Sequence, residues 1–522
     1  MSRRELLAAL RSLARERPAF LLSEVPPRAG RRVNPRELRR TLEPHLGFLG
    51  LRGEEREDDL LLSRLPPARP VLPSPDTLEA DRVFLGHPVI PRRLQELIEA
   101  YTGKKTGKSW DDPVVLDRIR AAIRAQKGEY WDQGRGRPIS YRAGYRVLAY
   151  LAYQFPVVFV QSLHLLHDMA GDGLLKERMR VLDIGSGPGT VPLALTDAWG
   201  RLSPGEVHLF ALEKETENLE AYRSLVPAFA EGNPAVHIEE PLQGDLSSLH
   251  PDDLPMGMDL IVFANVLSEL RKLSHREKAA LVGKMAGALS GDGIILLMEP
   301  ADRENSIALR RLAVALGEEG LFLSAPCTPL WNTACLPDRC WSFRETPPVS
   351  PPRLMSLLAS SEDGYRYLNT DVKFSYALLG KDRRPLVEYR VPRGAKALRL
   401  SKLQAHVKHR VNVVVAKMSG DLGGGRGHAV YKVCDGTPQK PVFAVVPEHQ
   451  AAHARALVEG RYGEILSLEG TLVRYNPARD AYNLFVDRST RVSSPEGTGP
   501  KRRKAGNPAK DGRGDRQGSL SG

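Results

Sequence analysis

The chain is poor in cysteine for its length of 522 residues, and it has no long apolar run. Only four cysteines are present, so a disulfide-stabilised secreted scaffold is excluded and a reducing compartment is indicated. No segment reaches the roughly 18 uninterrupted apolar residues that cross a bilayer. We therefore expect a soluble protein with no membrane partner.

A presequence for an organelle is not recognisable either. The first residues, MSRRELLAALRSLARERPAF, are arginine-rich and amphipathic. However, targeting peptides are poor in acidic residues, and Glu5 and Glu16 lie inside this stretch. An ordinary amphipathic helix is favoured, and with it a prokaryotic cytoplasmic location over a mitochondrial one.

Acidic residues are too few to balance the basic ones, and the formal net charge is +12. A basic chain favours polyanionic partners, of which nucleic acid is the obvious class. Much of the excess is arginine, which can also follow from the base composition of a genome. Charge by itself is thus only modest support for nucleic acid.

The stretch RVLDIGSGPGTVPLAL, residues 180–195, has the pattern of a buried strand, a glycine turn and a helix. Asp183 precedes the turn, and Gly185, Gly187 and Gly189 follow at alternate positions. The third glycine comes too early for the GxGxxG dinucleotide pattern. The order DxGxGxG resembles motif I of the class I S-adenosylmethionine-dependent methyltransferases, whose loop cradles the methionine part of the cofactor. A glycine turn in an unrelated α/β protein is the alternative.

Strands and helices continue to alternate after this turn, which predicts a doubly wound α/β sheet. The strand VHLFALE ends at Glu213, where a carboxylate can accept both ribose hydroxyls of the cofactor. Glu215 lies past the strand end and fits that role less well. Asp245 stands where this fold usually has the acid that contacts the adenine amine. Each of these acids could instead be a strand-end cap.

Three of the cysteines lie within APCTPLWNTACLPDRCWSF, a segment unsuited to regular structure. The fourth follows about a hundred residues later in HAVYKVCDG, so a shared metal centre would join two distant parts of the chain. Zinc sites usually draw ligands from CxxC pairs, which are missing here, and uneven spacings suit a larger cluster. From the residues alone an iron–sulfur cluster, zinc and unrelated thiols all remain open.

The chain as a whole resembles the methyltransferase-like assembly proteins of the mitochondrial small ribosomal subunit and their bacterial and archaeal relatives. The resemblance rests on DIGSGPG, EP after the fifth strand, the cysteine block, KFSY and VCDG, and covers roughly residues 80 to 470. It implies binding of S-adenosylmethionine and of small-subunit ribosomal RNA, with ribosomal proteins as further partners. It also implies a [4Fe-4S] cluster on four ligands: Cys327, Cys335, Cys340 and Cys434.

Changes in composition predict five regions. These are a small helical or winged-helix-like module (1–75), a helical domain (76–175), a class I methyltransferase domain with a cysteine-rich insertion (176–384), a β-rich, OB-like module (385–492) and a disordered basic tail (493–522). In the fourth region ALRLSKLQAHV, residues 397–407, is predicted as one of several short β-like runs.

The sequence does not identify a catalytic base. After the fourth strand, amine methyltransferases usually carry a polar clamp with two prolines and an aromatic residue, but this chain has ANVLSEL, in which Asn265 alone is suitable. Two hypotheses follow. The protein is either an enzyme that methylates small-subunit ribosomal RNA, or a non-catalytic RNA-binding assembly factor that uses the methyltransferase fold as a scaffold.

Overall fold

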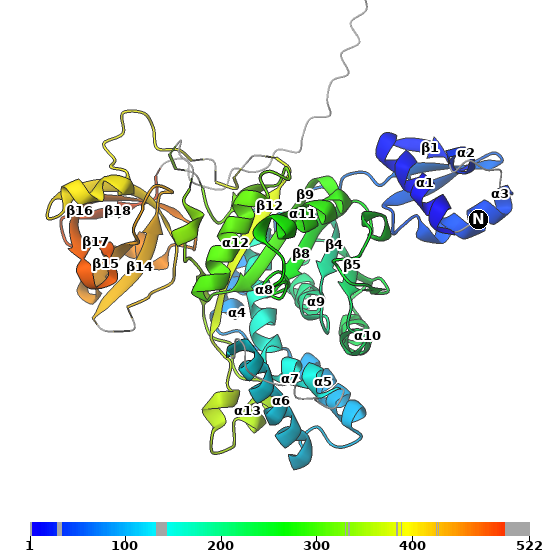
Figure 1. The fold of residues 1–522 in the computed structure, drawn as a ribbon, viewed down its shortest axis with the longest axis horizontal. Helices are drawn as coiled ribbons and strands as arrows, with labels where there is room; N and C mark the ends of the chain where they lie inside the picture. Colours follow the sequence, from blue (N-terminus) through cyan, green and yellow to red (C-terminus); the bar gives the residue numbers. More distant parts are fainter. Residues whose placement is uncertain are drawn as a thin grey trace, which may run out of the picture.

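The computed structural model describes residues 3–28, 34–131, 144–328, 330–331, 335–382, 385–387, 389–423, 425 and 427–495. An α/β body lies in the centre, with a small N-terminal module on one side and a β barrel on the other (Figure 1). A group of helices extends below the α/β body. The predicted basic tail from residue 496 onward lies outside the described residues.

The central sheet has the strand order β10-β12-β9-β8-β4-β5-β6. The strands are β4 (Arg178–Ile184), β5 (Glu206–Glu213), β6 (Val236–Ile238), β8 (Met258–Ala264), β9 (Leu289–Pro300), β10 (Phe322–Ala325) and β12 (Val372–Gly380). β12 contains KFSY and runs antiparallel to both of its neighbours, β9 and β10. The predicted doubly wound sheet is therefore confirmed, and the glycine turn follows its central strand.

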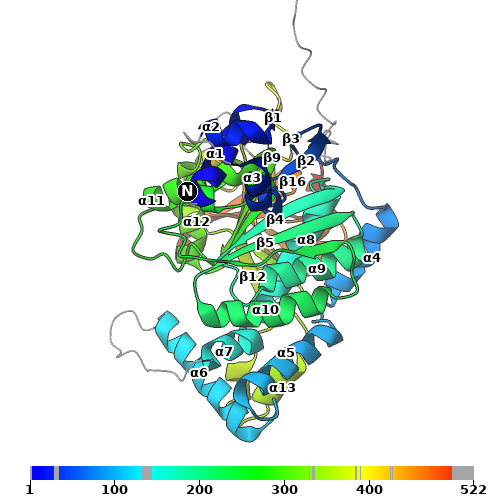
Figure 2. The same cartoon turned by 90° about the vertical axis from the view of Figure 1, so that its right-hand side faces the viewer.

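Helices cover both faces of this sheet (Figure 2). Along β4, Val181 belongs to one hydrophobic core, whereas Leu182 and Ile184 belong to the other. The run Val181, Leu182 and Ile184 is apolar because both faces of the strand are buried. The first core includes α8 (Phe155–Gly171), α9 (Thr190–Leu202) and α10 (Thr216–Ala230), and the second includes α11 (His275–Met285) and α12 (Arg303–Ala315).

The helices below the sheet come from two distant parts of the chain (Figure 2). α5 (Arg92–Thr106), α6 (Pro113–Trp131) and α7 (Tyr145–Tyr153) precede the sheet, whereas α13 (Arg353–Leu358) follows the cysteine block. α4 (Pro75–Gly86) packs against α8 and α9 instead. The guanidinium of Arg120 donates hydrogen bonds to the carbonyl groups of Leu357 and Leu358. These bonds fasten α13 to α6.

Within the described part of the chain, no single helix has the length and apolar character needed to cross a membrane. The adjacent helices α7 and α8 meet that requirement only when taken together, and they are bent by 51° where they join.

The N-terminal module consists of helices and a three-stranded antiparallel sheet. Its elements are α1 (Arg3–Glu16), β1 (Ala19–Leu21), α2 (Val25–Arg28), α3 (Pro35–Leu42), β2 (Leu51–Arg56) and β3 (Asp59–Arg64), and its strand order is β1-β3-β2. A helix, a strand, two helices and a hairpin in this order form a winged-helix arrangement. Phe48 packs edge-on against Phe210 of β5, so this module contacts the central sheet directly.

The C-terminal sheet closes on itself as a barrel of β13 (Arg410–Lys417), β14 (His428–Cys434), β15 (Val442–Pro447), β17 (Ala481–Phe485) and β16 (Ile465–Asn476), because β16 pairs back to β13. β18 (Arg491–Ser493) pairs with β16 outside the closed ring. If the five barrel strands are counted in chain order, their order around the barrel is 1-2-3-5-4, and a short helix α14 (Arg455–Glu459) lies between the third and the fourth strand in the sequence. This is the arrangement of an OB fold. The predicted OB-like module is confirmed, including the hairpin around NPARD.

One predicted β-like run is wrong. ALRLSKLQAHV contains a 3₁₀ helix over Leu400–His406 instead of a strand. Leu400 and Leu403 are both fully buried in the barrel core, and a spacing of three residues places them on one side of a helix with three residues per turn. The spacing of Leu400 and Leu403 therefore fits a helix, although the alternation of apolar and polar residues in this run had suggested a strand.

Candidate functional site

The glycine turn joins β4 to α9, and its three glycines all adopt positive φ angles. A Cβ atom at Gly185 would lie 2.7 Å from Cγ2 of Val266, and one at Gly189 would lie 2.3 Å from Cγ2 of Val226. A Cβ atom at Gly187 would meet nothing within 4 Å. Gly185 and Gly189 are therefore required for packing inside the protein, whereas Gly187 faces open space where a ligand can approach the backbone.

Asp183, the last but one residue of β4, is almost completely buried at the base of this turn. Neither of its carboxylate oxygens has a hydrogen-bond partner among the described residues. Burial, and secondarily the nearby Glu213, raise the pKa of Asp183 to about 8. Because a buried carboxylate without partners is costly, its presence indicates a polar or cationic group that binds at this point.

The perturbed pKa makes a prediction about stability without cofactor. Between about pH 4 and pH 8 the folded chain binds the Asp183 proton more tightly than the unfolded chain does. The contribution of Asp183 to the free energy of unfolding therefore falls as pH rises, by up to ~1.4 kcal/mol per pH unit. We expect Asp183→Asn to remove this pH dependence. The free energy of unfolding of the variant should therefore rise relative to that of the wild type as the pH approaches 8. Denaturant unfolding of both proteins without cofactor across this range is the measurement, and parallel pH curves would contradict the prediction.

Glu213, at the end of β5, is buried beside the turn and holds the loop in place. One carboxylate oxygen accepts a hydrogen bond from the backbone N–H of Gly187 at 2.8 Å. The other accepts from the N–H groups of Lys214 at 2.9 Å and Glu215 at 2.8 Å. Since a carboxylate can accept about four hydrogen bonds, Glu213 can accept one more from a ribose hydroxyl, as predicted for the cofactor.

Asp245 lies close to this end of β5 and is exposed. The N–H of the preceding Gly244 donates to the carbonyl of Glu213 at 3.0 Å. One carboxylate oxygen of Asp245 accepts from the N–H of Ser247 at 2.8 Å and from its hydroxyl group. The carboxylate therefore stabilises its own turn, and its predicted contact with the adenine amine stays a prediction.

Tyr150 of α7, which no motif in the sequence indicated, reaches this site from the helical part of the chain. Its hydroxyl lies 3.1 Å from Oγ1 of Thr190, the first residue of α9. Burial raises the pKa of Tyr150 to about 12, and Asp183 is among the acids that add to the shift. In the sequence, the tyrosines of YRVLAYLAY recur at a spacing that indicates one face of a helix, and this spacing does not indicate a binding site.

The loop after β8 is fixed by the buried Glu299 at the end of β9. Its carboxylate accepts hydrogen bonds from the N–H groups of Leu267 at 2.9 Å and Ser268 at 3.2 Å. Glu299 is thus a strand-end cap, the alternative left open for the strand-end acids. Asn265, the candidate polar residue of this loop, has a left-handed backbone with φ of +59°.

The structure brings the four cysteines into one neighbourhood between β10 and the barrel. After burial, Cys340 is among the groups that raise the pKa of Cys327, and both Cys340 and Cys335 raise that of Cys434. Among the described residues, no three cysteine sulfurs all lie within 4.8 Å of one another. In a tetrahedral zinc site with Zn–S bonds of about 2.3 Å, sulfurs lie roughly 3.8 Å apart. No three of these thiols are therefore placed as the ligands of a single zinc ion would be.

Two cations adjoin these thiols. Arg310 of α12 is completely buried, and its guanidinium donates to the carbonyl of Tyr376 at 2.8 Å and to the hydroxyl of Tyr462 at 3.3 Å. Its Nε atom has no partner, and no carboxylate of the described residues pairs with it. The Nζ atom of Lys432 donates to the carbonyl of Trp341. Arg310 is thus a buried cation and Lys432 a half-buried one, both without a carboxylate partner among the described residues, and such an environment suits an anionic group.

The barrel is joined to the cysteine block through Asp435 of VCDG, which is buried. Its Oδ2 atom accepts from the indole N–H of Trp331 at 2.8 Å and from the N–H of Leu400 at 2.9 Å. Arg339 donates to the carbonyl of Gln439 at 3.0 Å. These bonds hold the end of β14, which includes Cys434, against the cysteine block.

Taken together, the sheet order and the acid–glycine turn define a class I methyltransferase fold, in which the last strand is inserted antiparallel between the fifth and sixth. A family model described as "Mitochondrial small ribosomal subunit Rsm22" matches residues 144–422, more than half of the chain. The chain belongs to this family. A second model, described as "Domain of unknown function (DUF8157) C-terminal domain", matches residues 401–495, which form the barrel.

Solved methyltransferases align with the chain at low identity. A TehB-like S-adenosylmethionine-dependent methyltransferase from Corynebacterium glutamicum is 16% identical, with 42% of this chain and 88% of that chain covered and a TM-score of 0.24. Magnesium protoporphyrin IX methyltransferase from Synechocystis is 11% identical, with 52% and 100% covered and a TM-score of 0.27. Human N-acetylserotonin methyltransferase is 13% identical, with 61% and 88% covered and a TM-score of 0.23. No curated protein matches the chain.

Proposed function

We propose that this chain is an S-adenosylmethionine-binding, iron–sulfur protein that acts on small-subunit ribosomal RNA in ribosome assembly and methylates it. The observation that carries the proposal is the unpartnered, buried carboxylate of Asp183 beneath the open face of Gly187. The family description supports an association with the small ribosomal subunit. The net charge of +12 and the OB arrangement of the barrel support RNA as the ligand.

The residues around the turn fit the cofactor. Its ammonium and sulfonium groups are cationic, and the side chains of Asp183 and Glu213 lie at the carboxyl ends of adjacent strands, where a bound cation would favour the ionised form of Asp183. When bound, S-adenosylmethionine supplies an activated methyl group. The chain has to orient the nucleophile and exclude water, because alignment provides most of the rate enhancement in such a transfer. Asp183 and the N–H groups of the turn would hold the cofactor, and Glu213 keeps the turn in shape.

The four cysteines fit an iron–sulfur cluster better than zinc. A cubane cluster spaces its thiolates more widely than a single ion does, and no three cysteine sulfurs of the described residues lie as close together as zinc ligands would. Such a centre is anionic, and Arg310 and Lys432 would balance its charge. The cluster would fasten the barrel to the α/β body, where Asp435 and Trp331 already form a hydrogen bond.

Removal of the buried cation tests the charge balance. Arg310→Met keeps an apolar side chain of similar length but removes the positive charge, so we expect less iron and acid-labile sulfide per chain after anaerobic reconstitution. Any cluster that remains should have a lower reduction potential, because a nearby cation favours the reduced form. The matched control is Arg303→Met, since Arg303 is an exposed residue of the same helix and forms no ion pair with the described residues of the cysteine block. Equal iron content and potential in both variants would exclude the assigned role of Arg310.

A non-catalytic assembly factor is the second candidate, and the loop after β8 favours it. The N–H groups of Leu267 and Ser268 already donate to Glu299, so they do not point to a substrate. Asn265 is then the one candidate residue of this loop that the sequence suggested for orienting an amine nucleophile. In this case the fold would bind RNA and cofactor without methyl transfer.

The decisive experiment combines crosslinking of the protein to RNA in cells with mapping of methyl marks in that RNA. Cells with the protein, without it and with Gly187→Asp would be compared. A small-subunit mark that disappears in both altered strains supports the enzyme. Crosslinks to small-subunit RNA with unchanged marks support the assembly factor, and a lack of crosslinks to that RNA contradicts both.

A further inference from the structure

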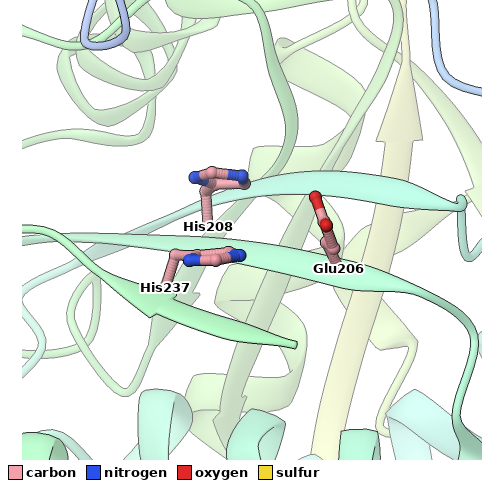
Figure 3. A group of neighbouring side chains, drawn as sticks. All are labelled: Glu206, His208 and His237. Carbon is pink, nitrogen blue, oxygen red and sulfur yellow. The ribbon is translucent and has the colours of Figure 1, made fainter. Parts of the chain in front are cut away.

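A second group of metal-binding side chains lies at the other end of the sheet. Glu206 and His208 come from β5, and His237 comes from β6 (Figure 3). One ligand atom from each residue lies within 4.8 Å of the other two. Among the described residues, this is the one group of three or more His, Cys, Asp or Glu side chains that meets this distance.

The strand pairing holds these side chains together. His208 and His237 are Cα partners in the parallel pairing of β5 and β6, and Glu206 is two residues before His208 and so on the same face. The imidazole rings are stacked, with centroids 4.5 Å apart and planes 23° from parallel. Figure 3 shows the Glu206 carboxylate beside one end of both rings. Because all three residues lie in paired strands, their backbones are already fixed in this arrangement.

None of the three side chains has another partner that would explain its position. Within the described chain, no hydrogen bond or ion pair is formed by the side chain of Glu206, His208 or His237. Two arginines of the neighbouring strand β4 are engaged elsewhere. Arg180 stacks on the Phe210 ring and donates to the carbonyls of Phe48 and Met256, and Arg178 donates to the carbonyl of Pro66.

We propose that Glu206, His208 and His237 form a binding site for a divalent transition-metal ion of the zinc type. Two imidazoles and one carboxylate suit such ions, whereas calcium and magnesium prefer oxygen ligands alone. Three protein ligands leave a coordination position open for water or for a side chain of a partner.

This site is separate from the methyltransferase site and independent of the function proposed above. Glu206 and Glu213 stand at opposite ends of the eight-residue strand β5, roughly 23 Å apart. A metal ion there is too remote to take part in methyl transfer. Since Arg180 joins this end of the sheet to Phe48 of the N-terminal module, the ion would strengthen the edge of the sheet beside that module.

Zinc stoichiometry of the full-length protein tests the site. The wild type, His208→Gln/His237→Gln and the control His449→Gln would be dialysed against low-micromolar zinc, and bound metal counted by mass spectrometry. His449 is exposed on the barrel, far from the group. The cysteines contribute equally in all three proteins, so the double variant should lose one equivalent while the control retains it. Equal zinc in the double variant and the wild type would overturn the proposal.

Cobalt substitution gives a second readout. The cobalt spectrum that the wild type shows and the double variant lacks should contain ligand-field bands without sulfur-to-cobalt charge transfer, because the ligands are nitrogen and oxygen. A difference spectrum with charge-transfer bands would assign the lost ion to cysteine and refute the His–His–Glu site. Far-UV circular dichroism of the double variant should match the wild type, because partly exposed side chains are replaced.

Discussion

Cys434→Ser is expected to abolish the cluster and to loosen the barrel. Cys434 ends β14 and is the one proposed ligand that belongs to the barrel, so its loss leaves three ligands on the other side of the junction. Binding of a structural zinc ion contributes about 10–16 kcal/mol of folding free energy in zinc-finger peptides, and a large part of the corresponding contribution of the cluster should disappear. The measurement is iron and sulfide content together with thermal unfolding of the anaerobically purified protein.

The control for this prediction is the wild type stripped of metal. If Cys434 acts through the cluster, the variant and the stripped wild type should unfold at the same temperature, well below the loaded wild type. The bonds of Asp435 to Trp331 and Leu400 should survive in both, so the barrel stays folded. A variant that retains full iron content would show that Cys434 is not a ligand.

Gly187→Asp is expected to eliminate S-adenosylmethionine binding while the protein stays folded. A Cβ atom at this position meets no protein atom within 4 Å, so the new carboxylate occupies the space that the cofactor needs. The positive φ of +57° costs about 1 kcal/mol for a residue with a side chain, which a chain of this size tolerates. Calorimetric titration with the cofactor and thermal unfolding are the two measurements.

Gly189→Asp is the matched comparison. Here the Cβ atom would lie 2.3 Å from Val226 and 3.0 Å from Tyr222, both in the hydrophobic core, so this variant should unfold or express poorly. The two substitutions are chemically identical and lie two residues apart. If Gly187→Asp bound the cofactor as well as the wild type, the assignment of the turn would fail.

The sequence pattern predicted the elements near the turn better than the contacts around it. The run of buried apolar residues in β4 and the glycines after it fix a strand and a turn locally, and the acid at the end of β5 follows the same pattern. The contact of Tyr150 with Thr190 depends on how a helix before the sheet packs on the first helix after it. Such packing leaves no local signature.

The two candidate metal sites also differ in how far the sequence alone could predict them. The cysteines were visible as a group because thiols are rare in this chain, although Arg310 beside them was not. Glu206, His208 and His237 were overlooked, because single histidines in two short strands resemble ordinary strand residues. Only the parallel pairing of β5 with β6 makes His208 and His237 neighbours.

The sequence by itself determined the doubly wound sheet, the OB-like barrel and the residues that surround the turn, since apolar periodicity and glycine conformation act over a few residues. The tertiary structure alone decided which glycine faces open space, which carboxylate lacks a partner and which side chains from distant strands meet. Those properties depend on long-range packing, in which every neighbour comes from another part of the chain.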